Sequence, residues 1–429
     1  MNITVLGTGY VGIVSAAVLA DFGHNIWGLD IDPKRVENLK KGKSPIYEPG
    51  LEELLQKGLE NQKLQFTTDY GQALEKTDII FICVGTPQAE SGEVELKYVY
   101  SAIEQIAKNL QNPSLIVLKS TVPPGIHLKL KEIMDQNTKV SYEFASTPEF
   151  LREGTAVSDT FNPDRIIIGT ESEKAQNTLL EIHKGLPGKR LCTDIISAQM
   201  IKYASNSFLA CKISFANAIA RICDLLGANV LDVMQGIGMD NRIGEKFLSP
   251  GLGFGGSCFP KDIKGLYFLS KQAGYDFKLL DEVSEINDSQ VAYYLTKTEK
   301  IIGNFADKNI TILGLAFKPD TDDMRESRTI PLVNELLEKG AKITAYDPIA
   351  TETAKVVFGD KIIYAKDKFE AIRDCDILIL ATDWNEFKNM DLVKIKQLMK
   401  GNIFVDGRNL YNPKDLKQFG FVYVGIGRI

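Results

Sequence analysis

Short apolar runs alternate with longer segments of small and apolar residues near the start of the chain. Asn2–Leu6 is a β-prone apolar run, and Asn25–Leu29 is a second one. Between them, Ile13–Phe22 contains no helix breaker, and Gly23 marks the end of the helix that this segment predicts. The order strand, helix, strand predicts an α/β unit with a parallel sheet and flanking helices.

The same pattern recurs far along the chain. Three predicted strand ends are matched in the same order: Asn2–Gly7 by Asn309–Gly314, Gly28–Pro33 by Ala345–Pro348, and Asp78–Ile82 by Asp376–Leu380. Matches in a conserved order indicate two related α/β units rather than a chance likeness between single strands.

A long uninterrupted segment lies between the two copies. Thr193–Leu226 contains no glycine or proline and is apolar around much of its girth, which predicts one helix of about 50 Å. Such a helix must be covered by the domains at its ends or by a second subunit, and we expect a homodimer interface on it. The predicted fold is α/β, with two Rossmann-like doubly wound parallel-sheet domains joined by a long central helix. The predicted domains are residues 1–192, 193–300 and 301–429.

A glycine-rich turn follows the first predicted strand. Gly7, Gly9 and Gly12 form the pattern GxGxxG, and Asp30 ends the second strand about 20 residues further on. Gly7 permits a tight turn, Gly9 lets the backbone approach a pyrophosphate, and Gly12 lets the helix pack closely on the strand. Asp30 would accept hydrogen bonds from a ribose and repel a 2′-phosphate. The pattern therefore predicts NAD as the cofactor, in preference to NADP.

The second copy lacks this glycine pattern. Gly314–Pro319 has no second close-approach glycine, and Lys318 stands where the pyrophosphate would lie. Two interpretations are open, a structural domain or a site for a different phosphorylated ligand. Lys318 and Arg408 each follow a predicted strand end, where open α/β sheets bind ligands, and they favour the second interpretation.

The densest chemical signal is the segment Gly251–Asp262. Four glycines precede Cys258, and Pro260 suits the first turn of a helix that runs through Ile263–Lys271. Cys258 would then lie just before a helix N-terminus, where amide dipoles favour thiolate over thiol. We interpret Cys258 as a nucleophile, with the carboxylate of Asp262 in the first turn beside it.

Two further pairs of polar residues are candidates for the same site. Lys202 and Asn206 are four residues apart on the long helix and so share one face. Glu149 and Glu153 follow the predicted strand Val140–Ala145, where carboxylates could transfer protons. Solvated surface charges would have the same spacing, so both interpretations stay open here.

A nicotinamide cofactor combined with a cysteine nucleophile narrows the reaction. Oxidation of an alcohol to an aldehyde needs a hydride acceptor and a base, but no thiol. Oxidation onward to an acid does need one, because a thiolate adds to the aldehyde and the resulting thiohemiacetal can lose a second hydride. The combination predicts a four-electron oxidation of an alcohol to a carboxylate.

Composition excludes several other classes of protein. The chain has 429 residues, with 50 Lys plus Arg against 56 Asp plus Glu, so no basic footprint for nucleic acid or an anionic membrane is present. We expect no signal peptide and no membrane span. The six cysteines form no close CxxC pair and only three histidines occur, so neither a disulfide framework nor a metal site is expected. A cytoplasmic protein with reduced thiols is the expectation.

The chain resembles the UDP-glucose 6-dehydrogenase family along essentially its whole length. The segments that carry the resemblance are Gly7–Gly12, Pro148–Glu153, Lys202–Asn206, Gly253–Asp262 and Gly314–Lys318. The resemblance implies that UDP-glucose and two NAD⁺ give UDP-glucuronate and two NADH. It also implies an arginine, Arg242, that is lent across a dimer interface.

The resemblance further implies roles for individual residues. Cys258 would be the nucleophile, Lys202 would stabilise the oxyanion, and Asn206 would position the sugar and a water. Asp262 would assist deprotonation and hydrolysis, Glu149 would be a further acid/base group, and Thr121 would lie near the nicotinamide. The implied cofactor contacts are Gly7, Gly9, Val11, Gly12, Asp30, Arg35, Thr86, Thr121, Glu153, Lys261 and Arg325; Arg35 stands where relatives often carry lysine. The implied substrate contacts are Glu149, Phe150, Leu151, Arg152, Lys202, Asn206, Arg242, Phe247, Leu248, Ser249, Pro250, Gly251, Gly255, Lys318 and Arg408.

Three alternatives remain at this point. Another nucleotide-sugar 6-dehydrogenase, such as one for GDP-mannose, is the nearest. A two-electron hydroxyacid dehydrogenase built on Lys202 and Asn206 would release one NADH per substrate. An NAD-dependent sensor would bind the cofactor without turning over a sugar nucleotide.

Overall fold

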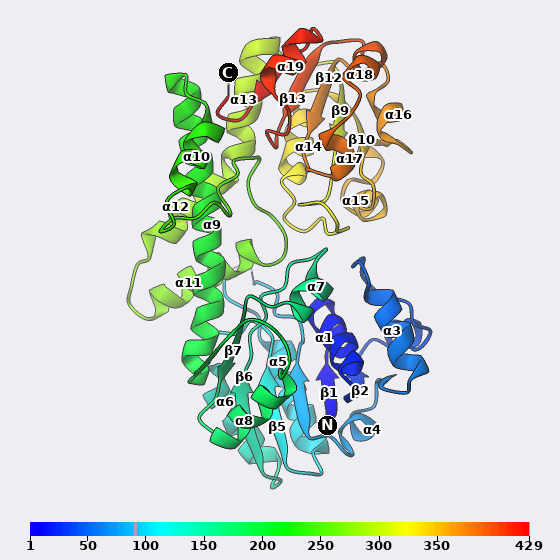
Figure 1. Ribbon diagram of the computed structural model, residues 1–429, viewed down its shortest axis with the longest axis vertical. Helices are drawn as coiled ribbons and strands as arrows, with labels where there is room; N and C mark the ends of the chain where they lie inside the picture. Colours follow the sequence, from blue (N-terminus) through cyan, green and yellow to red (C-terminus); the bar gives the residue numbers. More distant parts are fainter. Residues whose placement is uncertain (90–91, 429) are drawn as a thin grey trace. The chain divides into compact units, whose positions relative to one another are not determined.

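The chain forms two compact units, Met1–Ser205 and Asn206–Ile429, in a computed structural model that describes residues 1–89 and 92–428 (Figure 1). Each unit contains one sheet with helices packed on it, as the duplicated pattern predicted. The predicted fold class is therefore confirmed. The three predicted domain boundaries stay a prediction.

The first unit is built on an eight-stranded sheet with the order β3-β2-β1-β4-β5-β6-β7-β8. Its strands are β1 Asn2–Leu6, β2 Asn25–Leu29, β3 Leu64–Thr67, β4 Ile79–Ile82, β5 Ser114–Leu118, β6 Tyr142–Ser146, β7 Arg165–Gly169 and β8 Lys189–Thr193. Every pairing is parallel except β6 with β7. Strands β1 to β3 are added in one direction across the sheet, and β4 and the later strands are added in the other, so the strand order reverses between β1 and β4. Open α/β sheets bind ligands at such a switch point.

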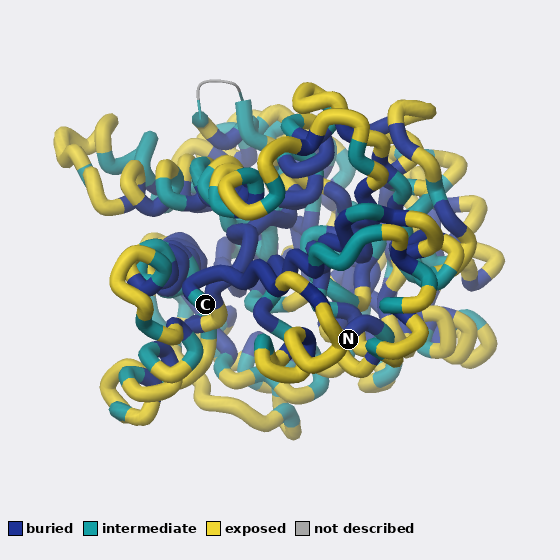
Figure 2. Tube along the Cα trace, turned by 90° about the horizontal axis from the view of Figure 1, so that it is seen from above, coloured by how far each residue is buried: buried dark blue, intermediate teal, exposed yellow. Residues whose placement is uncertain are grey.

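Helices cover both faces of this sheet. They are α1 Tyr10–Asp21, α2 Pro33–Lys40, α3 Leu51–Glu60, α4 Tyr70–Leu74, α5 Lys97–Asn109, α6 Ile126–Asn137, α7 Ala156–Phe161 and α8 Glu173–Ile182. One buried apolar layer joins the sheet to α1, α2, α3, α7 and α8, and a second joins it to α4, α5 and α6. The strands are apolar on both faces because both faces are covered. Figure 2 shows the result along the chain, with buried interior segments and exposed outer turns.

The second unit repeats the arrangement on a six-stranded parallel sheet with the order β11-β10-β9-β12-β13-β14. Its strands are β9 Asn309–Leu313, β10 Lys342–Tyr346, β11 Ile363–Tyr364, β12 Ile377–Leu380, β13 Ile403–Asp406 and β14 Val422–Gly425. Its helices are α10 Val230–Gly238, α11 Phe259–Gln272, α12 Lys278–Asp288, α13 Gln290–Ile302, α14 Thr329–Glu338, α15 Thr351–Phe358, α16 Lys368–Ile372, α17 Asn385–Lys388, α18 Leu392–Leu398 and α19 Pro413–Gln418, with a 3₁₀ turn at Gly359–Lys361.

The two sheets share one turn geometry at the first strand. The amide of Gly7 donates to the carbonyl oxygen of Leu29 at 2.8 Å, and the amide of Gly314 donates to that of Tyr346 at 2.9 Å. Both glycines have positive φ, +91° and +92°, which side chains rarely adopt. The sequence match therefore reflects a real structural repeat.

The predicted long helix is confirmed as α9, Ile195–Leu226, which runs through the boundary between the two units in the sequence. It begins two residues later than the sequence predicted. Among the described helices, α9 included, none combines the length and the apolar character that crossing a bilayer requires.

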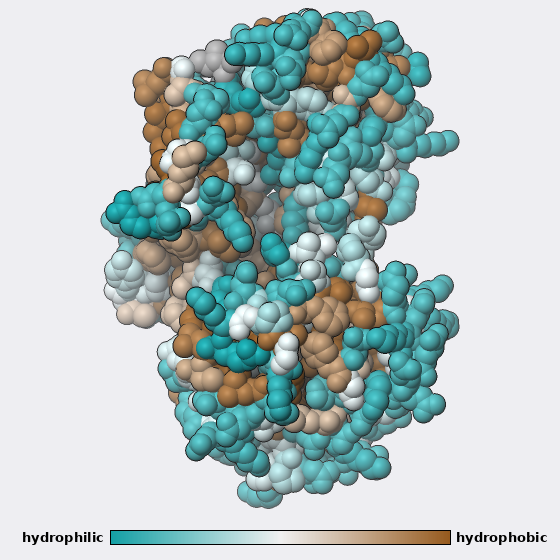
Figure 3. All heavy atoms as spheres, viewed as in Figure 1, coloured by the Kyte–Doolittle hydropathy of each residue, from teal (hydrophilic) through white to brown (hydrophobic). Residues whose placement is uncertain are grey.

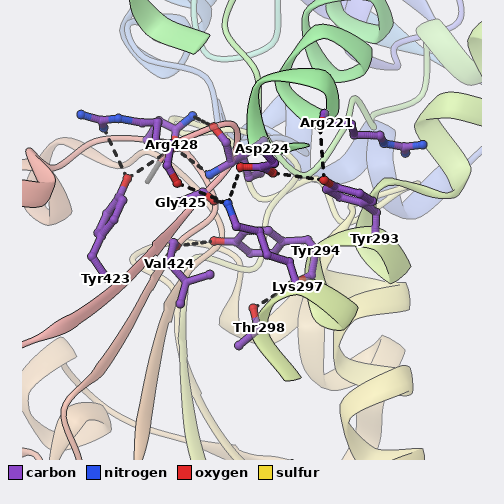
Figure 4. A network of polar contacts seen from close by, with 12 residues as sticks. Arg221, Asp224, Tyr293, Tyr294, Lys297, Thr298, Tyr423, Val424, Gly425 and Arg428 are labelled. Atoms are coloured by element: carbon purple, nitrogen blue, oxygen red, sulfur yellow. Dashed lines mark hydrogen bonds and ion pairs between the residues drawn. The ribbon is translucent and has the colours of Figure 1, made fainter. Parts of the chain in front are cut away.

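The C-terminal end of α9 is tied to the second unit by a polar network (Figure 4). Lys297 of α13 donates to the carboxylate of Asp224 on α9 and to the carbonyl oxygen of Gly425 at the end of β14. The hydroxyl of Tyr294 donates to the carbonyl oxygen of Val424 at 3.0 Å. The ammonium of Lys297 satisfies acceptor groups from two elements, α9 and β14, which fixes the end of α9 against this sheet.

Candidate active site

The glycine-rich turn of the first unit has a shape that fits a dinucleotide. A Cβ built on Gly12 would overlap the carbonyl oxygen of Gly7, so Gly12 is required for α1 to pack on β1. A Cβ built on Gly9 would meet nothing within 4 Å. Protein packing therefore requires Gly12 but leaves the space beside Gly9 open, as a pyrophosphate at the start of α1 requires.

Asp30 is buried beside this turn and stays ionised. Its carboxylate accepts from the amide and the hydroxyl of Thr8, from the amide of Asp32, and from the guanidinium of Arg35 at 3.1 Å. Burial raises the pKa of Asp30, but the hydrogen bonds from Asp32 and Thr8 and the charge of Arg35 lower it below the ordinary value. A buried carboxylate held in this form suits a ribose and opposes a 2′-phosphate.

The equivalent carboxylate in the second unit is used differently. Asp347 accepts from the amides of Leu315 and Ala316 at 2.7 and 3.1 Å, as Asp30 does from Thr8. The indole of Trp384 also donates to Asp347, at 3.2 Å. The Oδ2 atom of Asp347 is therefore engaged by a tryptophan indole, whereas that of Asp30 is engaged by the guanidinium of Arg35.

Loops after two neighbouring strands of the first sheet lie next to the glycine-rich turn. Ser120 donates from its amide to Ile82 at 2.9 Å and from its hydroxyl to Val84 at 2.7 Å, which ties the loop after β5 to the loop after β4. These loops carry Thr121 and Thr86, both half-buried. The structure thus brings the two predicted threonines to the carboxyl edge of the sheet where β1 ends.

Glu48 joins the glycine-rich turn to the segment that contains Glu153. The buried carboxylate of Glu48 accepts from the hydroxyl of Tyr10, from the amide of Gly154 at 2.7 Å and from that of Val157 at 3.3 Å. Burial, followed by the hydrogen bond to Glu48, raises the pKa of Tyr10. Sequence reasoning missed Glu48, because a glutamate in a loop far from both segments carries no pattern.

Glu149 and Lys202 form a buried ion pair in the first unit. The ammonium of Lys202 donates to Oε1 of Glu149 at 2.7 Å, and the amide of Leu151 donates to Oε2 at 2.6 Å. Glu149 is 8% exposed and Lys202 is 3% exposed. The solvated-charge interpretation is therefore wrong for this pair, since both charges are withdrawn from water and matched to each other.

Phe150 lies between two cations next to this pair. Its ring centroid is 3.8 Å from the guanidinium carbon of Arg165 and 5.5 Å from Nζ of Lys202. Arg152, by contrast, turns its guanidinium to Asp159 and is largely exposed. The structure brings Phe150 and Leu151 to Glu149, and Arg152 lines the same cavity with its guanidinium paired to Asp159.

Cys258 occupies the position that the sequence predicted. It is the N-cap residue of α11, Pro260 lies in the first turn, and the amide of Asp262 donates to the carbonyl oxygen of Cys258 at 2.9 Å. The sulfur is 3.7 Å from the hydroxyl oxygen of Ser257. The thiol is half-buried at a helix N-terminus, where the dipole of a fourteen-residue helix favours its anion.

Two glycines of the cysteine loop are required by packing on the loop between β9 and α14. A Cβ on Gly255 would overlap the carbonyl oxygen of Glu326, and Gly256 has φ +80° and donates to the carbonyl oxygen of Arg325 at 2.9 Å. Asn287 of α12 holds the loop from the other side, with hydrogen bonds to both backbone groups of Phe254. Packing within the protein therefore requires these glycines, in addition to the expected contact with a ligand. The spacing of residues in the sequence did not indicate that Asn287 would hold this loop.

Asp262 is the centre of a buried polar group in the second unit. It is 1% exposed, accepts from Nδ2 of Asn206 at 2.6 Å, and accepts from Nζ of Lys261 at 2.5 Å. The predicted position of Asp262 in the first turn is thus present, and its partners are Asn206 of the long helix and Lys261 as the neutralising cation.

Arg408 and the start of the cysteine loop meet at the carboxyl edge of the second sheet. Arg408 donates to the carbonyl oxygens of Ala381 at 2.7 Å and Phe317 at 3.2 Å. A Cβ on Gly251 would lie 3.3 Å from its guanidinium. The ammonium of Lys318 lies 5.4 Å from the ring centroid of the adjacent Phe317. Lys318, Arg408 and Gly251 therefore gather where β9, β12 and β13 end.

The remaining predicted contacts are more scattered. Phe247 has φ +66°, and Leu248 and Pro250 after it are buried. Arg242 is exposed and paired with Asp240, so the structure does not bring it to the other candidates within this chain. The side chain of Arg325 is likewise turned to Asp323.

Comparisons with known proteins cover the whole chain. Residues 1–187 match the NAD binding domain of the UDP-glucose/GDP-mannose dehydrogenase family, residues 196–289 match its central domain, and residues 311–413 match its UDP binding domain. The chain belongs to this dehydrogenase family. The predicted NAD cofactor and the predicted oxidoreductase class are confirmed, and the match of the third segment favours a phosphorylated ligand over a purely structural domain.

Individual relatives agree with this family. UDP-glucose 6-dehydrogenase TuaD of Bacillus subtilis is 44% identical over 429 residues, which cover all of this chain and 93% of that protein. The structure of a UDP-glucose dehydrogenase from Pyrobaculum islandicum has a TM-score of 0.93 and 38% identity, covering all of this chain and 98% of that one. A UDP-D-ManNAc dehydrogenase structure from Pyrococcus horikoshii has a TM-score of 0.88 and 28% identity, covering all of this chain and 99% of that one.

Proposed function

We propose that this dehydrogenase oxidises UDP-glucose to UDP-glucuronate with two NAD⁺ and one water, releasing two NADH. The observation that carries the proposal is the position of Cys258 at the N-terminus of α11, one helical turn before the buried Asp262. A two-electron alcohol oxidation needs no such thiol. The full-length similarity to UDP-glucose 6-dehydrogenases supports glucose as the sugar and uridine as the base.

The proposed reaction has two oxidations joined at the sulfur. NAD, when bound, accepts one hydride in each. Glu149 acts as the acid/base group for the hydroxyl proton, and Lys202 stabilises the developing oxyanion. The thiolate of Cys258 then forms a C–S bond to the aldehyde carbon. Loss of the second hydride leaves a thioester, and water attacks its carbonyl carbon, which breaks the C–S bond and returns the thiolate.

The buried group around Asp262 supports the hydrolytic half of the reaction. Asn206 would position the sugar and the water, and Asp262 would take a proton from the nucleophile or from the water. The hydrogen bond between them fixes the direction of both side chains, and Lys261 keeps the carboxylate compensated. Fixed donors and acceptors need no reorganisation when charge develops.

The binding contacts are proposed on the same basis. For NAD they are Gly7, Gly9, Val11, Gly12, Asp30, Arg35, Thr86, Thr121, Glu153, Lys261 and Arg325. For UDP-glucose they are Glu149, Phe150, Leu151, Arg152, Lys202, Asn206, Phe247, Leu248, Ser249, Pro250, Gly251, Gly255, Lys318 and Arg408. Arg242 would complete the substrate site of a second copy of the chain.

A homodimer through α9 is part of the proposal. Phe208, Phe215 and Ile222 lie seven residues apart along α9 and are 67%, 52% and 48% exposed. Leu225 and Leu226 extend this apolar stripe, and Figure 3 shows apolar side chains along the edge of the second unit formed by α9 and α10. Burial of such a stripe between two copies would remove it from water. The thiol chemistry also requires reduced cysteine, for which we propose a cytoplasmic location.

The NADH yield tests the function. UDP-glucose should give two NADH per molecule consumed, and GDP-mannose and UDP-N-acetylmannosamine should give little. One NADH per UDP-glucose would support a two-electron dehydrogenase instead. Cofactor binding without turnover of any sugar nucleotide would support a sensor.

A further inference from the structure

Lys119 is a second lysine near Glu149 that no sequence pattern singled out. It directly follows β5, two residues before Thr121, and lines a cavity of about 150 Å³ in the first unit. Glu149, Phe150 and Arg165 line the same cavity, together with His183 at the end of α8. Glu149 therefore faces one lysine along α9 and another across the cavity.

Two lysines and one backbone amide act on the carboxylate of Glu149. Burial raises the pKa of Glu149, but the charge and hydrogen bond of Lys202, the amide of Leu151 and the charge of Lys119 lower it below the ordinary value. Burial lowers the pKa of Lys119, opposed by Cys83 and Glu149, and the charge of Lys202 lowers it further. The two ammonium groups thus attract one carboxylate and repel each other.

Arg152, Asp159 and Asp164 also line the cavity, and the guanidinium of Arg152 is paired with the carboxylate of Asp159. The other titratable groups near Lys119 and Glu149 are Cys83, His183 and Arg165. Burial raises the pKa of the Cys83 thiol, after β4, to about 12, so the thiol is neutral. Burial lowers the pKa of His183 to about 4, and its Nδ1 donates to the carbonyl oxygen of Leu179 at 2.7 Å. Arg165 of β7 is separated from the pair by the ring of Phe150, on which it stacks.

We propose that Lys119 is a positioning residue for the oxidation, whose ammonium keeps Glu149 ionised across the cavity that both residues line. This inference rests on the proposed function of Glu149 and Lys202. An ionised Glu149 is needed for it to accept the hydroxyl proton, and a cationic Lys202 is needed to stabilise the oxyanion. Lys119 thereby sets the pH above which Glu149 can accept that proton.

The pH dependence of kcat tests this role. Lys119→Met should move the acidic limb, from Glu149, to higher pH by about one unit, because loss of a nearby cation raises the pKa of that carboxyl. Lys119→Arg should restore an acidic limb close to that of the parent enzyme. Lys57→Met is the control, because Lys57 forms a surface ion pair with Asp21 and its loss should leave the profile unchanged.

A structural role for Lys119 gives a different result. A Lys119→Met variant that loses activity with the acidic limb unmoved would overturn the inference, and so would one with the parent kcat and profile. If that variant fails to unfold cooperatively, Lys119→Gln is measured in its place with the same expectation. Failure of the parent enzyme to oxidise UDP-glucose would instead overturn the proposed function, so the parent NADH yield is measured first.

Discussion

Asn206 of α9 donates a 2.6 Å hydrogen bond to the carboxylate of Asp262, an almost fully buried aspartate in the first turn of α11. An aspartate at a helix start usually faces water and stabilises the N-terminus by about 0.3–1 kcal/mol. Here the carboxylate is enclosed, with Asn206 on one oxygen and Lys261 on the other. Stabilisation of the helix end alone does not require this enclosure, and the proposed proton transfer beside Cys258 would use a carboxylate held in a fixed direction.

Replacement of Asp262 by asparagine should therefore act on catalysis. Asp262→Asn should lower kcat by about 10²–10⁴-fold, because the amide cannot accept a proton. NADH binding and the Tm should stay close to the parent values. Asp281→Asn is the matched control, since Asp281 is an exposed first-turn aspartate of α12 and its loss should leave kcat unchanged. Equal kcat losses in the two variants would contradict the role of Asp262.

Substitution of alanine for glycine at two positions of the glycine-rich turn should cause two different defects, one in stability and one in cofactor binding. Gly12→Ala should lower the free energy of unfolding by about 1–3 kcal/mol, because its Cβ would overlap the carbonyl oxygen of Gly7. Gly9→Ala should leave the Tm within a few degrees but raise the Kd for NADH about tenfold or more, because its Cβ would enter the space that the pyrophosphate needs. Thermal unfolding and a fluorescence titration measure both quantities. Tight NADH binding by Gly9→Ala would place the cofactor elsewhere.

The lowered pKa of the buried His183 predicts that the stability of the folded chain depends on pH. Burial lowers its pKa to about 4 in the folded chain, below the ordinary value of about 6.5. Between these pH values, His183 is therefore protonated in the unfolded chain and neutral in the folded chain. The free energy of unfolding should fall as the pH drops from about 6.5 to about 4, and this contribution should change no further below that range. Urea unfolding at several pH values measures it, and in His183→Gln the slope in this interval should be smaller. An equal slope would assign the effect to other groups.

The sequence predicted the parts of the molecule that depend on local pattern. The apolar runs predicted both sheets, and the unbroken segment that ends at Leu226 predicted α9. Both predictions were possible because buried parallel strands and long helices depend on the pattern of consecutive residues. The turn at Gly7 and the cap at Cys258 were also predicted, since both are set by nearest neighbours. Helix and strand ends differed by up to three residues, as at α1, which begins at Tyr10 rather than Ile13.

The sequence could not predict contacts that join distant segments. Glu48 meets Gly154, and Asn287 meets Phe254, only after the sheets have assembled. The burial of Glu149 and Lys202 also depends on the assembled fold, which is why solvated charges were an open interpretation for them. The family resemblance named many of the site residues but not Glu48, Lys119 or Asn287, which position others.

Capture of the sugar on Cys258 tests the proposed oxidation most directly. Enzyme mixed with UDP-glucose and slowed by limiting NAD⁺ should yield, on acid quench and mass spectrometry, a peptide spanning Gly255–Lys261 that carries the sugar nucleotide on sulfur. Cys258→Ala should show no adduct and form no UDP-glucuronate, although it still binds NADH. Formation of the acid by Cys258→Ala at the parent rate, with no adduct in the parent enzyme, would contradict the thiol mechanism.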